Sequence, residues 1–145
     1  MNRSQVTRYT RQEAGLAYLA VTLFIDSPDG RRYLEFQLGD EPGDRASGYC
    51  IVDGPPTRFQ PGDGIEQLVT MLSSHACVYG GLLAARLDGP DLVLVFDEEA
   101  ARVFGWPREL PLHLAITDDD RAGLLAGLTE VLAVGPNGTT PVVAL

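Results

Sequence analysis

Two cysteines and two histidines are the side chains of this sequence best suited to holding a metal ion. His75 and Cys77 would share one face of a strand, and with Cys50 and His113 they match the ligand count of a Cys₂His₂ zinc site. The spacings do not match, because neither cysteine has a cysteine two to four residues away and the histidines stand 38 positions apart. We therefore expect no metal site.

The same residues could act as a nucleophile and its base. A Cys77–His pair would also need a third group to orient the base, and adjacency in the sequence specifies none. Two cysteines are too few for a disulfide framework, so we expect reduced, mostly buried thiols and a histidine on a sheet face. A minor enzyme that uses Cys77 or His113 remains an alternative.

Glycine-rich and acidic clusters are the other candidates for chemistry. The stretch Tyr79-Gly80-Gly81 has the spacing of neither phosphate-binding glycine pattern, and it predicts a bulge or a close backbone contact. Consecutive acids at residues 118–120 would point in different directions, so they fit the capping of a helix better than a cation site. The acids at residues 97–99 likewise fit the capping of a helix better than a cation site. No enzyme signature is present, so we expect a binding protein without a cofactor.

Charge is distributed unevenly along the chain. The sequence holds 20 acids and 11 basic residues, all of them Arg, for a net charge of −9. Residues 1–32 contain five Arg and three acids, a balance of +2, whereas residues 33–145 contain six Arg and seventeen acids, a balance of −11. Such an acidic body repels nucleic acid and anionic membranes and attracts cationic partners. Acidity that serves only solubility is the alternative interpretation.

The length of 145 residues predicts a single domain. We expect a polar N-terminal arm at residues 1–16, a folded body at residues 17–134 and a C-terminal tail at residues 135–145. The tail reads as a loose end, although Val142 and Val143 could add an edge strand. No apolar run is long enough to cross a membrane, and no secretory signal is visible, so we expect a cytoplasmic protein.

Hydrophobic periodicity predicts an α+β fold with a mostly antiparallel sheet of five or six strands. The expected strands are residues 17–25, 33–38, 49–52, 82–87, 92–96 and 110–116. Turn residues 27–30 and 88–91 predict two hairpins. Residues 65–72 fit a helix or a strand, and we favour a short helix.

Two further helices are expected in the second half. Asp97 is suited to cap a two-turn helix that ends at Gly105, and Thr117 to cap a longer one. The longer helix carries an apolar stripe that should pack on one face of the sheet, formed by Leu124, Leu125, Leu128, Val131 and Leu132.

The order of these elements resembles a known family. The stretch Tyr79-Gly80-Gly81-Leu82, the hairpin at residues 83–96, the helix at residues 97–105 and the closing strand and helix to Leu132 resemble immunity protein 10. Gly48-Tyr49-Cys50-Ile51-Val52 resembles the strand before them, so the likeness covers roughly residues 32–134. It implies a small cytoplasmic protein that binds and neutralises a cognate toxin of a bacterial polymorphic toxin system. No site residue is taken from the resemblance.

We predict the partner-binding residues from charge and turn chemistry. A nuclease-like toxin would present a cationic cleft, which acidic loops could occupy while an aromatic anchor slows dissociation. The expected contacts are Asp40, Glu41, Asp44, Asp53, Phe59 and Asp63. Trp106 is the second aromatic candidate, with a cap over the core as its alternative role. A homodimer is possible, and a small-molecule or peptide-binding module is the alternative function.

Overall fold

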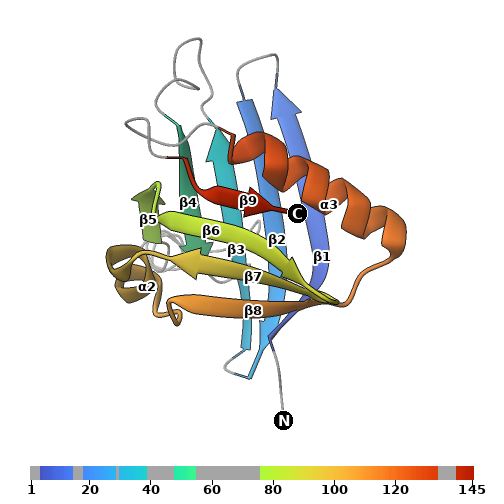
Figure 1. Cartoon of the computed structure of the whole chain (residues 1–145), viewed down its shortest axis with the longest axis horizontal. Helices are drawn as coiled ribbons and strands as arrows, with labels where there is room; N and C mark the ends of the chain where they lie inside the picture. Colours follow the sequence, from blue (N-terminus) through green and yellow to red (C-terminus); the bar gives the residue numbers. More distant parts are fainter. Residues whose placement is uncertain (1–3, 15–17, 29, 39–47, 55–75, 134–139) are drawn as a thin grey trace, which may run out of the picture.

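The computed structural model describes residues 4–14, 18–28, 30–38, 48–54, 76–133 and 140–145 (Figure 1). The described chain forms β1 (Gln5–Ala14), β2 (Tyr18–Ser27), β3 (Gly30–Leu38), β4 (Tyr49–Gly54), β5 (Ala76–Tyr79), β6 (Leu82–Asp88), β7 (Asp91–Phe96), α2 (Glu98–Phe104), β8 (Glu109–Leu114), α3 (Asp118–Val131) and β9 (Val142–Ala144). The predicted α+β class and both helices of the second half are confirmed. The predicted helix at residues 65–72 and the loop at residues 39–46 lie outside the described residues.

The nine strands form one sheet in the order β5-β4-β3-β2-β1-β8-β7-β6-β9. Neighbouring strands are antiparallel, except that β1 pairs with β8 and β6 with β9 in parallel. In Figure 1 the strands β6 to β9 lie in front of β1 to β4 and cross them, so the sheet folds over into two layers. The side chains between the layers form the hydrophobic core.

The expected count of five or six strands is wrong, because the described chain also contains β1, which was taken for a polar arm, the short strand β5 and the edge strand β9. In residues 5–13 of β1, Val6 is fully buried and Tyr9 packs partly buried against the core, whereas the other side chains are polar and exposed. Arg11 forms an ion pair with Glu130 of α3 at 2.6 Å. A strand whose charges are matched by a helix shows no apolar alternation, so hydrophobic periodicity cannot detect it.

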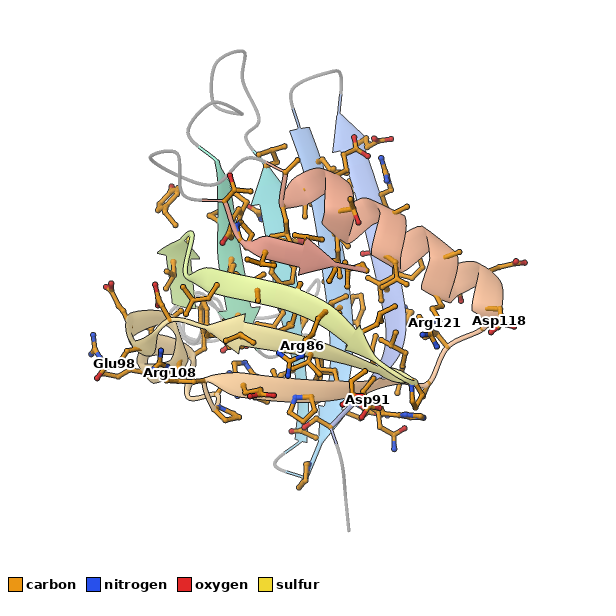
Figure 2. All side chains as sticks on the ribbon, viewed as in Figure 1. Arg86, Asp91, Glu98, Arg108, Asp118 and Arg121 are labelled. Atoms are coloured by element: carbon orange, nitrogen blue, oxygen red, sulfur yellow. The ribbon has the colours of Figure 1, made fainter. Side chains whose placement is uncertain are left out.

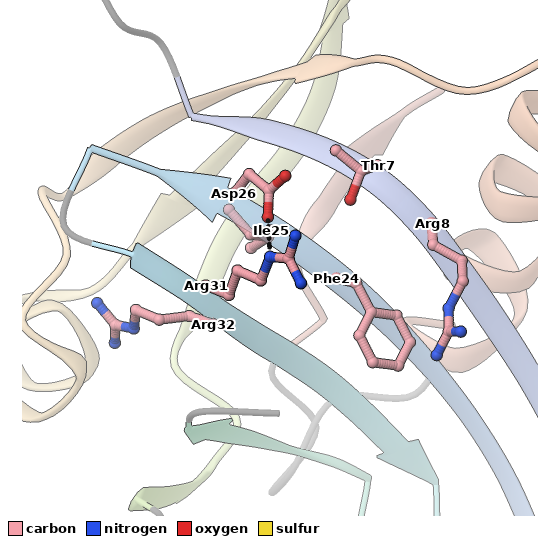
Figure 3. A pocket seen from close by; sticks show the side chains of 7 residues that line it. All are labelled: Thr7, Arg8, Phe24, Ile25, Asp26, Arg31 and Arg32. Carbon is pink, nitrogen blue, oxygen red and sulfur yellow. Dashed lines mark ion pairs between the residues drawn. The ribbon is translucent and has the colours of Figure 1, made fainter. Parts of the chain in front are cut away.

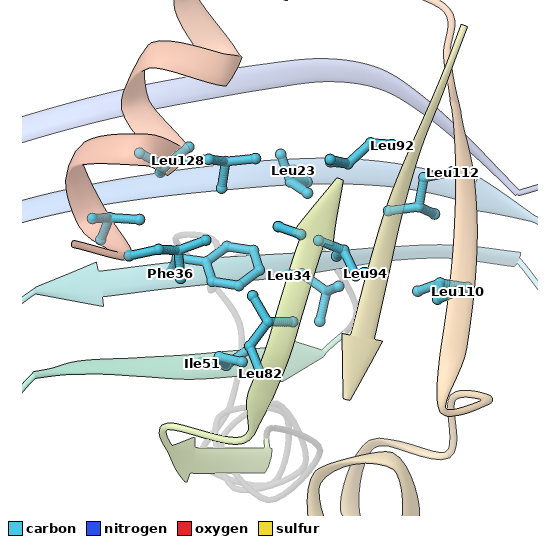
Figure 4. Close-up of a cluster of buried hydrophobic side chains, with 14 of the residues drawn as sticks. Leu23, Leu34, Phe36, Ile51, Leu82, Leu92, Leu94, Leu110, Leu112 and Leu128 are labelled. Atoms are coloured by element: carbon cyan, nitrogen blue, oxygen red, sulfur yellow. The ribbon is translucent and has the colours of Figure 1, made fainter. Parts of the chain in front are cut away.

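The hairpin of β2 and β3 follows its prediction. Ser27 pairs with Gly30 across the turn, and Gly30 adopts a positive φ of 123°. Leu34, Phe36 and Leu38 alternate with less buried neighbours, so one face of β3 is covered. In Figure 4 Leu34 and Phe36 extend from the back layer toward side chains of the front layer. Each such large apolar side chain contributes roughly 1.5–3 kcal/mol by its burial.

Helix α3 packs on β1, β2 and β3. The hydroxyl of Thr117 accepts a hydrogen bond from the Asp120 amide at 3.2 Å, as the capping prediction required. Leu124, Leu128 and Leu132 are fully buried, which confirms the apolar stripe. The helix can approach β1 closely because residue 123 is glycine, since a Cβ there would collide with the hydroxyl of Tyr9.

Helix α2 closes the other end of the core. Asp97 caps it by accepting the Ala100 amide at 2.8 Å, and Gly105 ends it with a positive φ of 70°. The connection from β5 to β6 runs directly over this helix. Gly81 has a φ of +92°, and a Cβ on it would lie 2.8 Å from that of Ala100. Of the predicted bulge or close backbone contact, the close contact is confirmed at Gly81.

The C-terminal tail is not wholly a loose end. Val142, Val143 and Ala144 pair with Ala84 to Arg86 of β6, which makes β9 an edge strand. The alternative that Val142 and Val143 extend the sheet is thus confirmed. Residues 134–139 lie outside the described part of the chain.

Candidate functional site

Most of the predicted partner-binding residues cannot be placed. Asp40, Glu41, Asp44, Phe59 and Asp63 all lie outside the described residues, so their role stays a prediction.

Asp53 is the exception, and its position corrects the expectation of an exposed loop. It lies within β4, opposite Leu34 of β3, and only 5% of its surface is exposed. Its carboxylate forms an ion pair with the Arg32 guanidinium, which also donates to the Phe104 carbonyl at 2.6 Å. Asp53 therefore joins β3, β4 and the end of α2 instead of facing a partner.

Trp106 completes this buried polar group. The Arg32 guanidinium stacks on the indole ring at 3.9 Å, and Trp106 is 9% exposed, so its role as a cap over the core is confirmed. Burial raises the pKa of Asp53 by more than the Arg32 charge lowers it. The nearby Trp106 indole also lowers the pKa of Asp53. Among the described atoms, Trp106 Nε1 and Asp53 Oδ1 nevertheless have no hydrogen-bond partner.

The two thiols lie together on the outer side of β4 and β5. Cys50 pairs with Tyr79 and Val52 with Cys77, which places both thiols diagonally on one face. Burial, followed by the neighbouring Cys77, raises the pKa of Cys50 to about 12. Cys50 is therefore a poor nucleophile near neutral pH. Cys77 is exposed, so the expectation of buried thiols is wrong for it.

The histidines do not complete a catalytic group with these thiols in the described structure. His113 lies on β8, in the other layer, and its Nδ1 is 3.2 Å from an Asp91 carboxylate oxygen. His75 lies outside the described residues. No three His, Cys, Asp or Glu side chains of the described chain gather as a metal-binding set.

A concavity of about 660 Å³ lies where β1, β2 and β3 meet at the β2–β3 turn. We call it the arginine pocket, and Figure 3 shows the side chains that matter for its chemistry: Thr7, Arg8, Phe24, Asp26, Arg31 and Arg32. The Arg8 guanidinium stacks on Phe24 at 4.1 Å, and Arg31 lies 3.4 Å from the Asp26 carboxylate. Arg8 and Arg31 therefore direct two guanidinium groups into one recess of an acidic protein. The guanidinium of Arg32 is instead turned to the core face, toward Asp53 and Trp106.

A second surface lies at the connection between the layers. We call it the Tyr79 corner, and it consists of Tyr79, Leu83, Asp97, Glu98 and Glu99. Tyr79 is 76% exposed and Leu83 is 47% exposed. The Asp97 amide donates to the Gly81 carbonyl at 2.8 Å, which brings the acidic start of α2 beside this connection. Arg102 and Arg108 follow toward and beyond the end of the helix.

The sequence held signals for both surfaces. The excess of arginine before residue 33 marks the arginine pocket, but the polar segment that carries Arg8 was not expected to be a strand. Tyr79 directly precedes two glycines, and glycines that turn the chain sharply leave the preceding side chain at a corner.

Comparison of the chain with protein-family models, with curated proteins and with solved structures finds no match. Among the described helices, none has the length and apolar character needed to span a membrane.

Proposed function

We propose that this protein is a cytoplasmic immunity protein that binds and neutralises a cognate bacterial toxin domain without catalysing a reaction. The observation that carries the proposal is the Tyr79 corner, where an exposed aromatic ring precedes the connection that meets the acidic start of α2. The resemblance of residues 32–134 to immunity protein 10 supports the same function.

The composition of the corner suits a protein partner. Tyrosine is enriched among residues that dominate binding energy, because it supplies a large, rigid contact area at low conformational cost. Leu83 is a second exposed apolar side chain near this connection, and Asp97, Glu98 and Glu99 provide negative charge at the start of α2, where the Asp97 amide donates to the Gly81 carbonyl. This combination fits a toxin surface with an apolar recess surrounded by basic residues.

The charge of the whole chain acts at longer range. A net charge of −9 attracts a cationic partner and raises the rate of encounter. Rapid capture matters for an immunity protein, because each unbound toxin molecule can damage the cell. The predicted loop residues Asp40, Glu41, Asp44, Phe59 and Asp63 would extend the contact surface.

Binding to the toxin domain encoded beside this gene tests the proposal. Removing the ring with Tyr79→Ala should weaken binding by about 2 kcal/mol, roughly thirtyfold in Kd, whereas Tyr79→Phe should keep most of the affinity. Isothermal titration calorimetry measures both.

A matched pair of charge variants separates local contact from overall charge. Glu98→Gln with Glu99→Gln and Asp118→Asn with Asp119→Asn each remove two charges from the first turn of a helix. Glu98 and Asp118 lie at opposite ends of the molecule in Figure 2. The first pair should weaken binding more than the second. Equal effects, together with an unaffected Tyr79→Ala variant, would exclude the corner as the contact surface.

A further inference from the structure

The arginine pocket has a charge opposite to that of the molecule around it. Arg8 and Arg31, two of the eleven basic residues of the chain, direct their guanidinium groups into this one recess, and Arg32 lines it without doing so. Asp26 is the acidic side chain that lines it with them. At physiological ionic strength, salt screens the charges of the acidic surface beyond a distance of roughly 8 Å. The electrostatic potential inside the recess is therefore set by the local arginines.

The three arginines differ in their availability. Arg32 is engaged by Asp53, Trp106 and the Phe104 carbonyl. Arg31 is 81% exposed, and its contact with the half-exposed Asp26 is 3.4 Å long, so an anion could compete for it at little cost. Arg8 has an ordered position over Phe24 and no carboxylate partner among the described residues.

These two arginines flank one aromatic ring. Figure 3 shows Phe24 between the side chains of Arg8 and Arg31. A guanidinium offers two parallel N–H donors that match the oxygens of a phosphate group. An oxyanion held between Arg8 and Arg31 would therefore lie next to the edge of an apolar ring.

A β-bulge shapes the same recess. Val6 pairs with Ile25 and Arg8 with Phe24, so Thr7 is an extra residue of β1 without a partner in the β1–β2 register. Bulges redirect side chains and occur often beside binding sites. Thr7 lines the pocket, where its hydroxyl offers a further donor to an oxyanion. The volume of about 660 Å³ is within the usual range for small-molecule sites and exceeds what a bare phosphate fills.

We propose that the arginine pocket binds a small molecule that carries a phosphate group. Arg8 and Arg31 hold the phosphate oxygens, Thr7 donates to them, and the organic part of the ligand packs along Phe24. This site is separate from the Tyr79 corner and does not depend on the immunity function.

Calorimetric titration of the whole chain at about 0.05 M salt tests the site. The probes are adenosine monophosphate, inorganic phosphate and adenosine. Adenosine monophosphate should bind, inorganic phosphate should bind more weakly, and adenosine should give no signal. Absence of binding by both phosphate compounds at millimolar concentration would overturn the proposal.

Variants locate the binding. Arg8→Gln and Arg31→Gln should each raise the Kd for adenosine monophosphate about tenfold or more, because each removes a charge-assisted donor. Arg102→Gln removes one exposed arginine from α2, outside the pocket, and should change the Kd less than twofold. The Arg31 side chain is largely exposed, so its replacement leaves the fold intact even if Arg8→Gln perturbs it. An equal loss in all three variants would show diffuse attraction and contradict the site.

Discussion

The arginine pocket and the Tyr79 corner are opposite in both shape and charge. The pocket is recessed, contains the guanidinium groups of Arg8 and Arg31 and lies among the first three strands. The corner protrudes, carries an exposed ring and three acids, and lies where the chain passes from one layer to the other. A recess lined by guanidinium groups suits a small anion, whereas an exposed ring on an acidic protein suits a basic protein surface.

The difference also concerns what each region contributes to folding. Arg32 of the pocket is bound to buried groups from β4 and the end of α2, so part of the pocket belongs to the core. Tyr79 is mostly exposed, so its ring adds little to the stability of the fold. Replacement of Arg32 should therefore change stability, and replacement of Tyr79 should change binding.

The largest expected effect concerns the core that supports both regions. Leu128 is fully buried between α3 and the back layer. Leu128→Ala should lower the free energy of unfolding by about 2–5 kcal/mol through the cavity it leaves. Urea denaturation measures this, with Ala126→Ser, an exposed change on the same helix, as the control. A loss below about 1 kcal/mol would contradict the packing of α3.

The next effect separates the two regions directly. Arg32→Met removes the partner of the buried Asp53 and should cost about 3 kcal/mol at pH 7, whereas Tyr79→Ala should cost less than about 0.5 kcal/mol. Asp53→Asn should be milder than Arg32→Met, because burial already raises the pKa of Asp53 and favours its neutral form. Urea denaturation of the three variants measures the loss of unfolding free energy in each and so tests this ranking.

Lowering the pH should reduce the loss of unfolding free energy that Arg32→Met causes. Without the guanidinium, the pKa of Asp53 rises further in the folded state. A carboxyl group whose pKa is raised by folding stabilises the folded protein fully when the pH is below the pKa of that group in the unfolded chain, about 3.9. This stabilisation is lost as the pH rises through the pKa in the folded state. The difference in unfolding free energy between the unaltered protein and Arg32→Met should therefore shrink from pH 7 to pH 5. A constant difference would show that Asp53 does not carry the effect.

A smaller effect tests the long-range charge of the proposed interface. Raising the salt concentration from about 0.05 to 0.5 M shortens the Debye length from roughly 14 to 4 Å. The association rate constant with a cationic toxin domain should fall by about tenfold, while the dissociation rate constant changes less. Surface plasmon resonance resolves the two rates. An association rate that does not depend on salt would remove electrostatic steering from the account.

The smallest effect concerns the thiols, which belong to neither region. Cys77 is exposed, whereas burial and the nearby Cys77 hold the pKa of Cys50 at about 12. Iodoacetamide at neutral pH should modify Cys77 no faster than free cysteine and Cys50 far more slowly, as mass spectrometry would show. Faster reaction of Cys77 than of free cysteine, or stoichiometric zinc in the protein, would contradict the expected absence of catalytic chemistry.

The sequence predicted the second half of the fold better than the first. The hairpin of β6 and β7, the caps at Asp97 and Thr117 and the stripe on α3 depend on neighbouring residues, so local patterns reveal them. Strand β1 pairs along its length with the neighbouring β2, but its mostly polar side chains show no apolar alternation, and the edge strand β9 depends on a partner far along the chain. Asp53 was placed in a loop because its partner, Arg32, is 21 residues away and no local pattern links them.

Co-expression with the toxin domain encoded next to this gene tests the central claim most directly. Cells that produce the toxin with the unaltered protein should survive, and survival should fall with Tyr79→Ala but not with Tyr79→Phe. Immunoblotting of the soluble fraction confirms that each variant accumulates equally. Death of cells in which the unaltered protein accumulates in soluble form would contradict the immunity function.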